Sequence, residues 1–244
     1  MKEVKKGHLH PITQIMREFM AIFNDMGFTV ATGPELETEF YNFDALNIPS
    51  DHPARDMQDT FWIKEKMGEV GEVAKGEKSE RHVMRTHTSS VQIRFMQNHK
   101  PPFKMVSPGR VFRNEATDAT HETQFYQVEG LYVDKNVSMA HLKGTLKELF
   151  EKLYGDSIEI RFRPSFFAFV EPGVEVDVKR GDKWLEVCGA GLVHPEVLRA
   201  GGINPEEWQG FAFGFGFDRM VMLKYELDDI RMLYNGDERL IEQF

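Results

Sequence analysis

The stretch from 110 to 130 carries more polar chemistry than the face of a protein core would. Two segments of alternating pattern flank a polar, turn-like run, and in an extended chain residues two apart share a face. A hairpin would therefore gather a cation, carboxylates, an amide and an aromatic ring on one surface: Arg113, Glu115, Phe125, Gln127 and Glu129. His121 would lie near the bend. Because a core face alternates apolar with polar residues, we interpret this hairpin as a functional surface.

A second candidate is the glycine-rich run that ends at Arg219. Residues 211–217 alternate phenylalanine with alanine or glycine, a pattern typical of a strand that lacks side chains on one face, where a ligand can approach the backbone closely. The residues that follow look helical, which places Arg219 in a first helical turn. A cation there opposes the helix dipole unless an anion is bound, so the position favours a phosphate-containing ligand. The glycines match neither a dinucleotide fingerprint nor a P-loop.

Two shorter stretches carry further candidates. Ser89 and Gln92 have the spacing of a capping box, which predicts a helix to about Asn98, and His87 just before it can face a ligand near the helix N-terminus. Ser89 is explained as well by capping as by binding. Three phenylalanines within 166–169 belong either to the core or to an aromatic-lined pocket. The adjacent Glu171 is either a metal or amine ligand or an ordinary surface carboxylate.

The elements that must position these residues follow from periodicity. Apolar residues at helical spacing predict amphipathic helices at 11–27 and 138–155. Short alternating or apolar runs predict strands at 28–31, 83–85, 157–163, 174–179 and 184–188. Consecutive strands with hairpin-length links indicate an antiparallel sheet, so we expect an α+β fold with helices packed on one side of the sheet. Residues 40–62 are expected to form a long structured loop, and 64–80 an exposed hairpin.

Composition narrows the class of protein. With 244 residues, the chain fits one domain, and its net charge of −9 confines any contact with a polyanion to a local patch or to a partner's surface. Since no apolar run reaches about 18 residues, no transmembrane helix is expected. The N-terminus lacks the apolar segment of a secretory signal. Cys188 is the only cysteine, so an intrachain disulfide is impossible, which suits a reducing compartment such as the cytoplasm.

Three separated stretches resemble, in order, the motifs of class II aminoacyl-tRNA synthetases, and more closely those of the bacterial-type phenylalanyl-tRNA synthetase alpha subunit. Motif 1 matches the helix ending in MGFTVATGPELE with Pro34, motif 2 matches 112–115 and 121–125, and motif 3 matches GFGFDR with Arg219. The stretches HPARDMQDTFW, RTHTSS and VEPGVEVD extend the resemblance over essentially the whole chain. The resemblance implies a class II synthetase-like antiparallel sheet flanked by helices, in one catalytic domain over 1–244.

The resemblance also implies roles for individual residues. Those expected to bind ATP are Arg113, Glu115, His121, Phe125 and Arg219, with Arg113 and Arg219 as catalytic residues. Those expected to bind the amino acid are Trp62, His87, Ser89, Gln127, Glu129, Phe167, Phe169 and Ala212. Glu171 is expected to be a ligand of Mg²⁺. Asp218 stands where the family usually has glutamate and is expected to change little, because the shorter acid keeps the charge. Ala168 and the run 188–191 also depart from the usual family pattern, which puts the pocket's shape in question but not the reaction.

The implied reaction is ATP-dependent activation of L-phenylalanine to phenylalanyl-adenylate and transfer to the 2′-hydroxyl of tRNA(Phe). The implied partner is a beta subunit, in an α2β2 assembly. The family's N-terminal helical hairpin, which contacts tRNA, is expected to be absent. Two alternatives stay open: a stand-alone paralogue that adenylates an amino acid without charging tRNA, and a non-catalytic regulatory paralogue. The intact Arg113, Glu115, Phe125 and Arg219 argue against the regulator.

Overall fold

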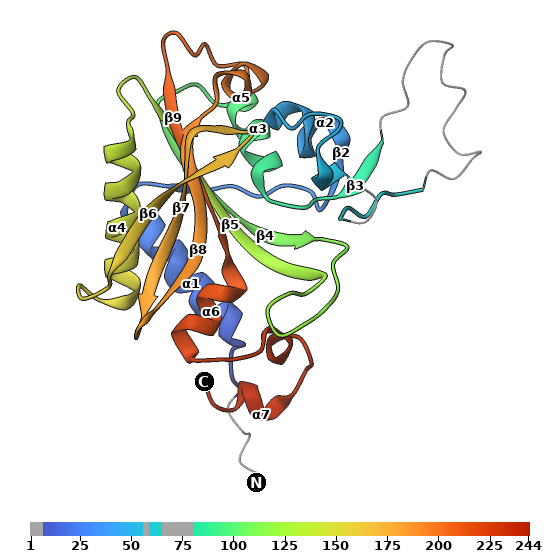
Figure 1. The fold of residues 1–244 in the computed structure, drawn as a ribbon, viewed down its shortest axis with the longest axis vertical. Helices are drawn as coiled ribbons and strands as arrows, with labels where there is room; N and C mark the ends of the chain where they lie inside the picture. The colour runs from blue at the N-terminus through green and yellow to red at the C-terminus, as the bar shows by residue number, and fades with distance from the viewer. Residues whose placement is uncertain (1–6, 56–58, 65–80) are drawn as a thin grey trace.

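The computed structural model describes residues 7–55, 59–64 and 81–244, and a seven-stranded sheet runs through its centre (Figure 1). The strands, in order across the sheet, are β1 (Thr29–Val30), β4 (Phe103–Phe112), β5 (Gln124–Asp134), β9 (Gln209–Gly216), β8 (Lys183–Val193), β7 (Val170–Arg180) and β6 (Ile160–Phe167). Every neighbouring pair is antiparallel except β1 and β4. The expected antiparallel sheet is confirmed, whereas the hairpin expected at 64–80 lies almost entirely outside the described residues.

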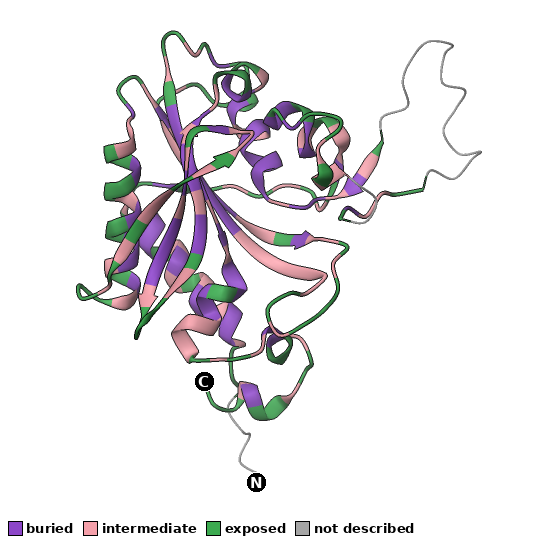
Figure 2. Ribbon diagram, viewed as in Figure 1, coloured by how far each residue is buried: buried purple, intermediate pink, exposed green. Residues whose placement is uncertain are grey.

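Helices cover both faces of the sheet to different extents, which corrects the prediction that they pack on one side only. The long helices α1 (Pro11–Asp25) and α4 (Met139–Tyr154) pack with α6 (Phe217–Tyr225) on one face and form the larger buried cluster (Figure 2). The bounds of α1 and α4 agree with the sequence prediction to within two residues at each end. On the opposite face, α2 (Glu39–Asn42), α3 (Ser89–Asn98) and α5 (Pro195–Ala200) form a second cluster with the ends of β4, β5 and β8. The rest of that face is left for the candidate site.

The remaining elements are short. Residues 40–62, expected as a loop, contain most of α2 and the 3₁₀ turns η1 (Asp44–Leu46) and η2 (Pro53–Arg55). A separate two-stranded sheet pairs β2 (Leu36–Thr38) with β3 (His82–Met84). The chain ends with η3 (Ile230–Leu233) and α7 (Glu238–Ile241). Within the described part of the chain, no helix is both long and apolar enough to cross a membrane.

Strand β9 shows how the sequence separates the two faces of the sheet. Phe211, Phe213 and Phe215 are buried on the helical side, where the Phe213 ring stacks on Phe23 at 5.6 Å between centroids. The alternate residues carry a methyl group or no side chain, because residues two apart share a face. This confirms the prediction that one face of the strand is bare. The bare face lies under the candidate site.

Gly130 in β5 makes room for this phenylalanine row. It lies directly opposite Phe213 in the strand register, and a Cβ atom at Gly130 would lie 2.1 Å from Phe213 Cζ. We expect Gly130→Ala to lower the free energy of unfolding by about 3 kcal/mol, because the ring is already packed against Phe23 and Phe28 and overpacked cores are strained. Urea unfolding measures the change.

The matched control is Gly144→Ala in α4, where an added Cβ would meet nothing within 4 Å. That variant should gain stability, by about 1 kcal/mol, because alanine has the higher helix propensity. Equal unfolding midpoints for Gly130→Ala and the wild type would contradict the packing argument.

Candidate active site

Two cavities lie next to each other on the open face of the sheet. The larger has a volume of about 470 Å³ and the smaller about 310 Å³. They share five lining residues: Arg113, Glu115, Gln127, Gly189 and Gly214. The glycines come from β8 and β9, so the shared wall is partly bare backbone. Ligands bound in the two cavities would therefore meet at Arg113.

The larger cavity has an aromatic wall. The Phe167 and Phe169 rings stack at 5.7 Å between centroids, and Ala212 also lines the cavity. A Cβ at Gly189 would lie 2.9 Å from Phe167 Cζ, so the missing side chain lets this ring lie against the sheet. The strand register shifts between Ser165 and Phe167, and such a bulge re-aims side chains. Both phenylalanines and Ala212, which the resemblance predicts to bind the amino acid, thus line one cavity.

A buried carboxylate forms one polar end of this cavity. Glu129 is 5% exposed and accepts hydrogen bonds from the Thr88 backbone N–H at 3.2 Å, Gln92 Nε2 at 3.0 Å and Ser89 Oγ. Burial raises the pKa of Glu129 to about 7, against the opposing effects of these hydrogen bonds and of two nearby arginines. When ionised, the carboxylate is a ready partner for an ammonium group.

These contacts correct the prediction for the start of α3. The N-cap residue is Thr88, whose side chain makes no capping bond, and the pair with capping-box spacing does not form a capping box. Ser89 and Gln92 both donate to Glu129 of β5 instead. A charged acceptor forms stronger hydrogen bonds than a neutral one, so the contact across the fold replaces the local one.

His87 presents a neutral imidazole to the larger cavity. Its Nε2 lies 2.9 Å from the Asn42 carbonyl, and the Asn42 side chain exchanges two hydrogen bonds with Thr86. Burial lowers the pKa of His87 to about 3, with repulsion from Arg113 adding to the effect. His87 Nδ1 and Gln127 Oε1 are buried and have no hydrogen-bond partner among the described residues. Both side chains line the cavity and can bind the polar groups of a ligand.

Arg113 lies where the cavities join, just after β4. Its Nε donates to the Thr86 carbonyl at 3.2 Å, and its guanidinium lies 5.0 Å from the centroid of the Phe125 ring. Burial lowers the pKa of Arg113, and the nearby Glu115 and Glu129 raise it. Because arginine stays protonated in proteins, the junction carries a poorly solvated positive charge. An anion bound in either cavity would balance that charge.

The smaller cavity is polar and lies over the start of α6. His121, Phe125, Glu186, Asp218 and Arg219 are among its lining residues. Arg219 is in the first turn of α6 as predicted, and its Nη1 donates to the Glu186 carbonyl at 3.1 Å. The two arginines and the histidine of this cavity can hold phosphate oxygens, whereas the carboxylates of Glu115, Glu122 and Glu186 on the same wall suit an accompanying cation.

Asp218, at the start of α6, is 1% exposed and also lines this cavity. It accepts hydrogen bonds from the Tyr126 backbone N–H at 2.6 Å and from the Tyr234 hydroxyl. Burial raises its pKa to about 6. The side chain therefore joins β5, α6 and the C-terminal segment, and it positions the first turn that carries Arg219.

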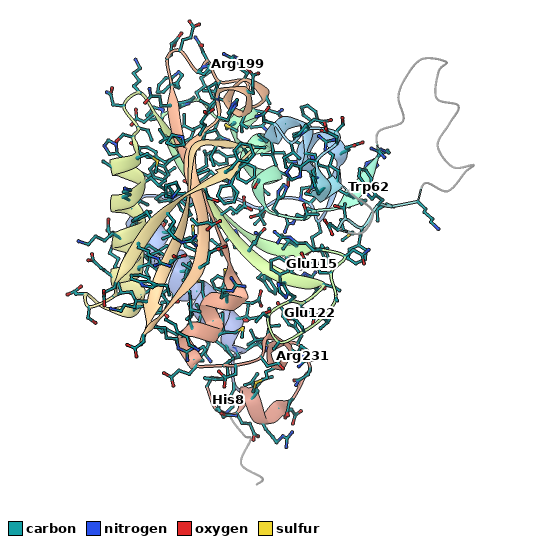
Figure 3. The ribbon with its side chains drawn as sticks, in the orientation of Figure 1. His8, Trp62, Glu115, Glu122, Arg199 and Arg231 are labelled. Carbon is teal, nitrogen blue, oxygen red and sulfur yellow. The ribbon has the colours of Figure 1, made fainter. Side chains whose placement is uncertain are left out.

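Two predicted site residues lie outside both cavities. Trp62 packs between Phe43, at 6.2 Å between centroids, and the Arg81 guanidinium, at 4.2 Å. It lies apart from Glu115 (Figure 3). Glu171 is 78% exposed at its side chain and lies 3.7 Å from His194 Nε2. No group of three or more metal-binding side chains occurs in the described ranges. The roles of Trp62 and Glu171 stay predictions.

Sequence reasoning missed Gln92 and Glu186 as site residues. The spacing of Gln92 from Ser89 was informative, but it was interpreted as a helix cap. Glu186 lies on β8 beside the smaller cavity, and nothing in its local pattern distinguishes it from other exposed strand carboxylates. Only the pairing of β8 with β9 brings it to the site.

Comparison with known proteins assigns a class to this fold. The family model described as tRNA synthetases class II core domain (F) matches residues 1–244. Among solved structures, pyrrolysyl-tRNA synthetase from Desulfitobacterium hafniense superposes with a TM-score of 0.69 over 93% of this chain and 74% of that chain. At 15% identity this likeness shows a shared fold. The molecule therefore has the class II tRNA synthetase core.

Curated relatives narrow the class. Proteins named phenylalanine–tRNA ligase alpha subunit match 98% of this chain at 49% identity in Chlorobium chlorochromatii and Clostridium perfringens, and at 48% in Synechocystis. The matches cover 70%, 69% and 68% of those proteins, respectively. The chain belongs to the phenylalanine–tRNA ligase alpha subunit family of class II synthetases.

Proposed function

We propose that this chain is the catalytic alpha subunit of a phenylalanine–tRNA ligase. It would activate L-phenylalanine with ATP to phenylalanyl-adenylate and transfer the phenylalanyl group to tRNA(Phe). The observation that carries the proposal is the junction at Arg113, where an aromatic-walled cavity with a buried carboxylate meets a polar cavity with further cations. The names of relatives at 49% identity support the same reaction.

The larger cavity suits phenylalanine. The substrate ring would lie against Phe167 and Phe169, with Ala212 limiting its length, because aromatic rings pack favourably edge to face or offset. The ammonium would bind Glu129, with Ser89, Gln127 and His87 as neighbouring polar groups. The carboxylate would then face Arg113 at the shared wall. Trp62 is kept as an amino-acid contact on the resemblance alone.

The smaller cavity suits ATP. Arg113 would hold the α-phosphate, while His121 and Arg219 would hold the outer phosphates. Phe125 would stack on adenine with Arg219 on the other face, and Glu115 would complete the contacts. These five residues all line this cavity, which supports the proposal. Arg113 already makes a cation–π contact with the Phe125 ring.

The chemistry needs positioning and charge balance. A phenylalanine carboxylate oxygen attacks the α-phosphorus, the new P–O bond forms, and the bond to pyrophosphate breaks with its electrons on the leaving oxygen. Two anions must approach each other, so Arg113 offsets charge at the point of attack and Arg219 at the leaving group. No side-chain nucleophile is required. In the second step a tRNA ribose hydroxyl attacks the acyl carbon and releases AMP.

Mg²⁺ would accompany ATP and reduce the negative charge of its phosphates. It binds oxygen ligands and takes several of them from substrate phosphates and water. Glu115 and Glu186 carry carboxylates on the wall of the smaller cavity and fit such an ion. Glu171 is kept as a magnesium ligand on the resemblance alone, since it lines neither cavity.

The proposed partners are tRNA(Phe) and a beta subunit in an α2β2 assembly. The net charge of −9 supports a partner that supplies positive surface for tRNA. Exposed apolar side chains at Val30 and Leu36 flank the motif 1 proline, Pro34, and support an interface in this region. A cytoplasmic location is part of the same proposal.

Phenylalanine-dependent exchange of pyrophosphate into ATP tests this proposal. We expect exchange that requires phenylalanine, and charging of tRNA(Phe) when the beta subunit is present. Exchange without charging under every condition would instead identify the stand-alone adenylating paralogue. No exchange with or without beta subunit and tRNA would overturn the enzymatic proposal.

We expect Ala212→Gly to admit para-substituted phenylalanines. Removing the methyl group lengthens the cavity at its floor, so kcat/KM for p-chlorophenylalanine relative to phenylalanine should rise by about tenfold or more, as for other single-methylene changes in apolar pockets. Pyrophosphate exchange with each amino acid measures the ratio. Ala200→Gly, at the end of α5, makes the same change outside both cavities. An unchanged ratio in Ala212→Gly would contradict the placement of the ring.

A further inference from the structure

A tight turn in the β4–β5 connection brings a carboxylate against His121. Asp118 Oδ1 accepts hydrogen bonds from the backbone N–H of Thr120 at 2.7 Å and of His121 at 2.8 Å, and from the Thr120 hydroxyl at 2.9 Å. His121 Nδ1 lies 3.0 Å from both Asp118 oxygens. The hydrogen bond from the Thr120 backbone N–H has the largest effect and the one from the His121 side chain the next largest. Together they hold the pKa of Asp118 well below its usual range. Asp118 is therefore a carboxylate at working pH.

This contact selects one form of the imidazole. A carboxylate can only accept a hydrogen bond, so a proton between the two groups is on His121 Nδ1. The Thr120 hydroxyl also lies 3.0 Å from Nδ1, and it is free to accept there because its own proton goes to Asp118 Oδ1. Nε2 is then the ring nitrogen left for a ligand, and within the described part of the chain it has no protein partner. Phosphate oxygens accept hydrogen bonds, so they bind Nε2 when it also carries a proton. The ring would then bridge Asp118 and a phosphate.

The turn is fixed to the wall of the smaller cavity. The Asp118 N–H donates to the His121 carbonyl at 3.0 Å, which closes the turn. The Ile230 N–H donates to the Ala119 carbonyl at 2.9 Å, and Ile230 lines the same cavity as His121. Arg231, next to Ile230, lies near Glu122 at this connection (Figure 3). The C-terminal segment thus helps to hold His121 at the cavity.

We propose that Asp118 is a positioning residue for ATP. It holds a proton on His121 Nδ1, and its negative charge balances the ring when Nε2 carries the second proton and donates to an outer phosphate. The proposal rests on the proposed function, in which His121 contacts ATP, and it adds the group that orients the contact.

The Asp118→Asn variant changes the contact with His121 but can keep the hydrogen bonds that shape the turn. The three hydrogen bonds that form the turn all go to Oδ1, whereas Oδ2 contacts only His121. An asparagine can keep its oxygen at the Oδ1 position and place its NH₂ group against Nδ1. An amide donor there makes Nδ1 the acceptor, so the proton of the neutral ring moves to Nε2.

The test combines ¹⁵N NMR of the histidine-labelled 244-residue chain with kinetics of the enzyme assembled with its beta subunit. His121→Gln identifies the His121 signals. We expect the Nδ1–H form in the wild type and the Nε2–H form in Asp118→Asn. KM for ATP in pyrophosphate exchange should rise about tenfold, because the neutral ring of the variant donates a weaker hydrogen bond to phosphate than a charged ring balanced by Asp118. KM for phenylalanine should stay within about twofold of the wild type. Asp237→Asn, at the cap of α7 outside both cavities, is the matched control and should leave all three readouts unchanged.

The outcomes are distinguishable from failure of the proposed function. If the wild type shows no exchange, the enzymatic proposal fails, and the NMR measurement still decides the tautomer. An Nε2–H form in the wild type, or an Nδ1–H form that persists in Asp118→Asn, overturns the positioning role. A tautomer change with an unaltered KM for ATP also overturns it. Equal rises in both KM values would identify a general loop defect and likewise contradict the proposal.

Discussion

Arg113→Gln is expected to lower kcat/KM for pyrophosphate exchange by about three orders of magnitude, because a preorganised cation at the point where charge develops is among the largest contributions to catalysis. Arg113 is the arginine that lines both cavities, so both the attacking carboxylate and the α-phosphate would lose their counter-charge. Glutamine keeps a polar side chain with part of the length of arginine. The loss should therefore fall on kcat as well as on both KM values.

Two variants sharpen this prediction. Arg113→Lys keeps the charge but loses the planar fork that holds two oxygens and stacks on Phe125, so we expect an intermediate loss, of about a hundredfold. Arg110→Gln removes the same charge three residues earlier on β4, where the side chain is exposed and pairs with Glu35 at 2.9 Å. That control should stay within about twofold of the wild type, as for exposed ion pairs. An Arg113→Gln enzyme with more than a tenth of wild-type activity would exclude the proposed role.

The sequence predicts those elements whose pattern is local and repeated. The helices at 11–25 and 139–154 and strand β9 each bury one face. A buried face requires apolar residues at the regular spacing of the helix or strand, and this spacing is visible in the sequence. The short elements between 39 and 55 carry no such period, because three or four residues per element are too few to show one. Their positions depend on contacts such as Arg55 with Glu39 and Asp44.

The candidate site was predictable where motif order carried the information. Arg113, Glu115, His121, Phe125 and Arg219 all line the smaller cavity, and their roles in ATP binding stay predictions. Contacts across the fold explain the failures. Ser89 and Gln92 were interpreted as partners of each other because Glu129 is 37 residues beyond Gln92.

The phenylalanines at 166–169 show a different limit of prediction from sequence. Composition allows either a core or a pocket, and a strand with regular alternation would send neighbouring residues to opposite faces. The bulge after Ser165 removes that alternation, so Phe166 and Phe167 both line the larger cavity. A register shift depends on the partner strand, which local sequence does not reveal.

Glu129→Gln should raise KM for phenylalanine by about a hundredfold, because a charge-assisted contact to the ammonium is lost in a buried site. The amide also places a donor among the three groups that now donate to the carboxylate, so one of them is left unpaired. The change should be specific: the preference for phenylalanine over 3-phenylpropionate, which lacks the ammonium, should fall by a similar factor in competition binding. Glu159→Gln, an exposed carboxylate that pairs with Lys179, is the control.

The same carboxylate predicts the pH dependence of phenylalanine binding. Burial raises the pKa of Glu129 to about 7 in the free protein. Below that pH the group is a neutral acid and cannot balance an ammonium charge; above it the carboxylate binds. As pH falls from 8 to 6, kcat/KM for phenylalanine should therefore decline by about tenfold, since this ratio reports the ionisation of the free enzyme. Glu129→Gln should show no such decline. A flat wild-type profile across this range, or the same profile in both proteins, would show that Glu129 does not hold the ammonium.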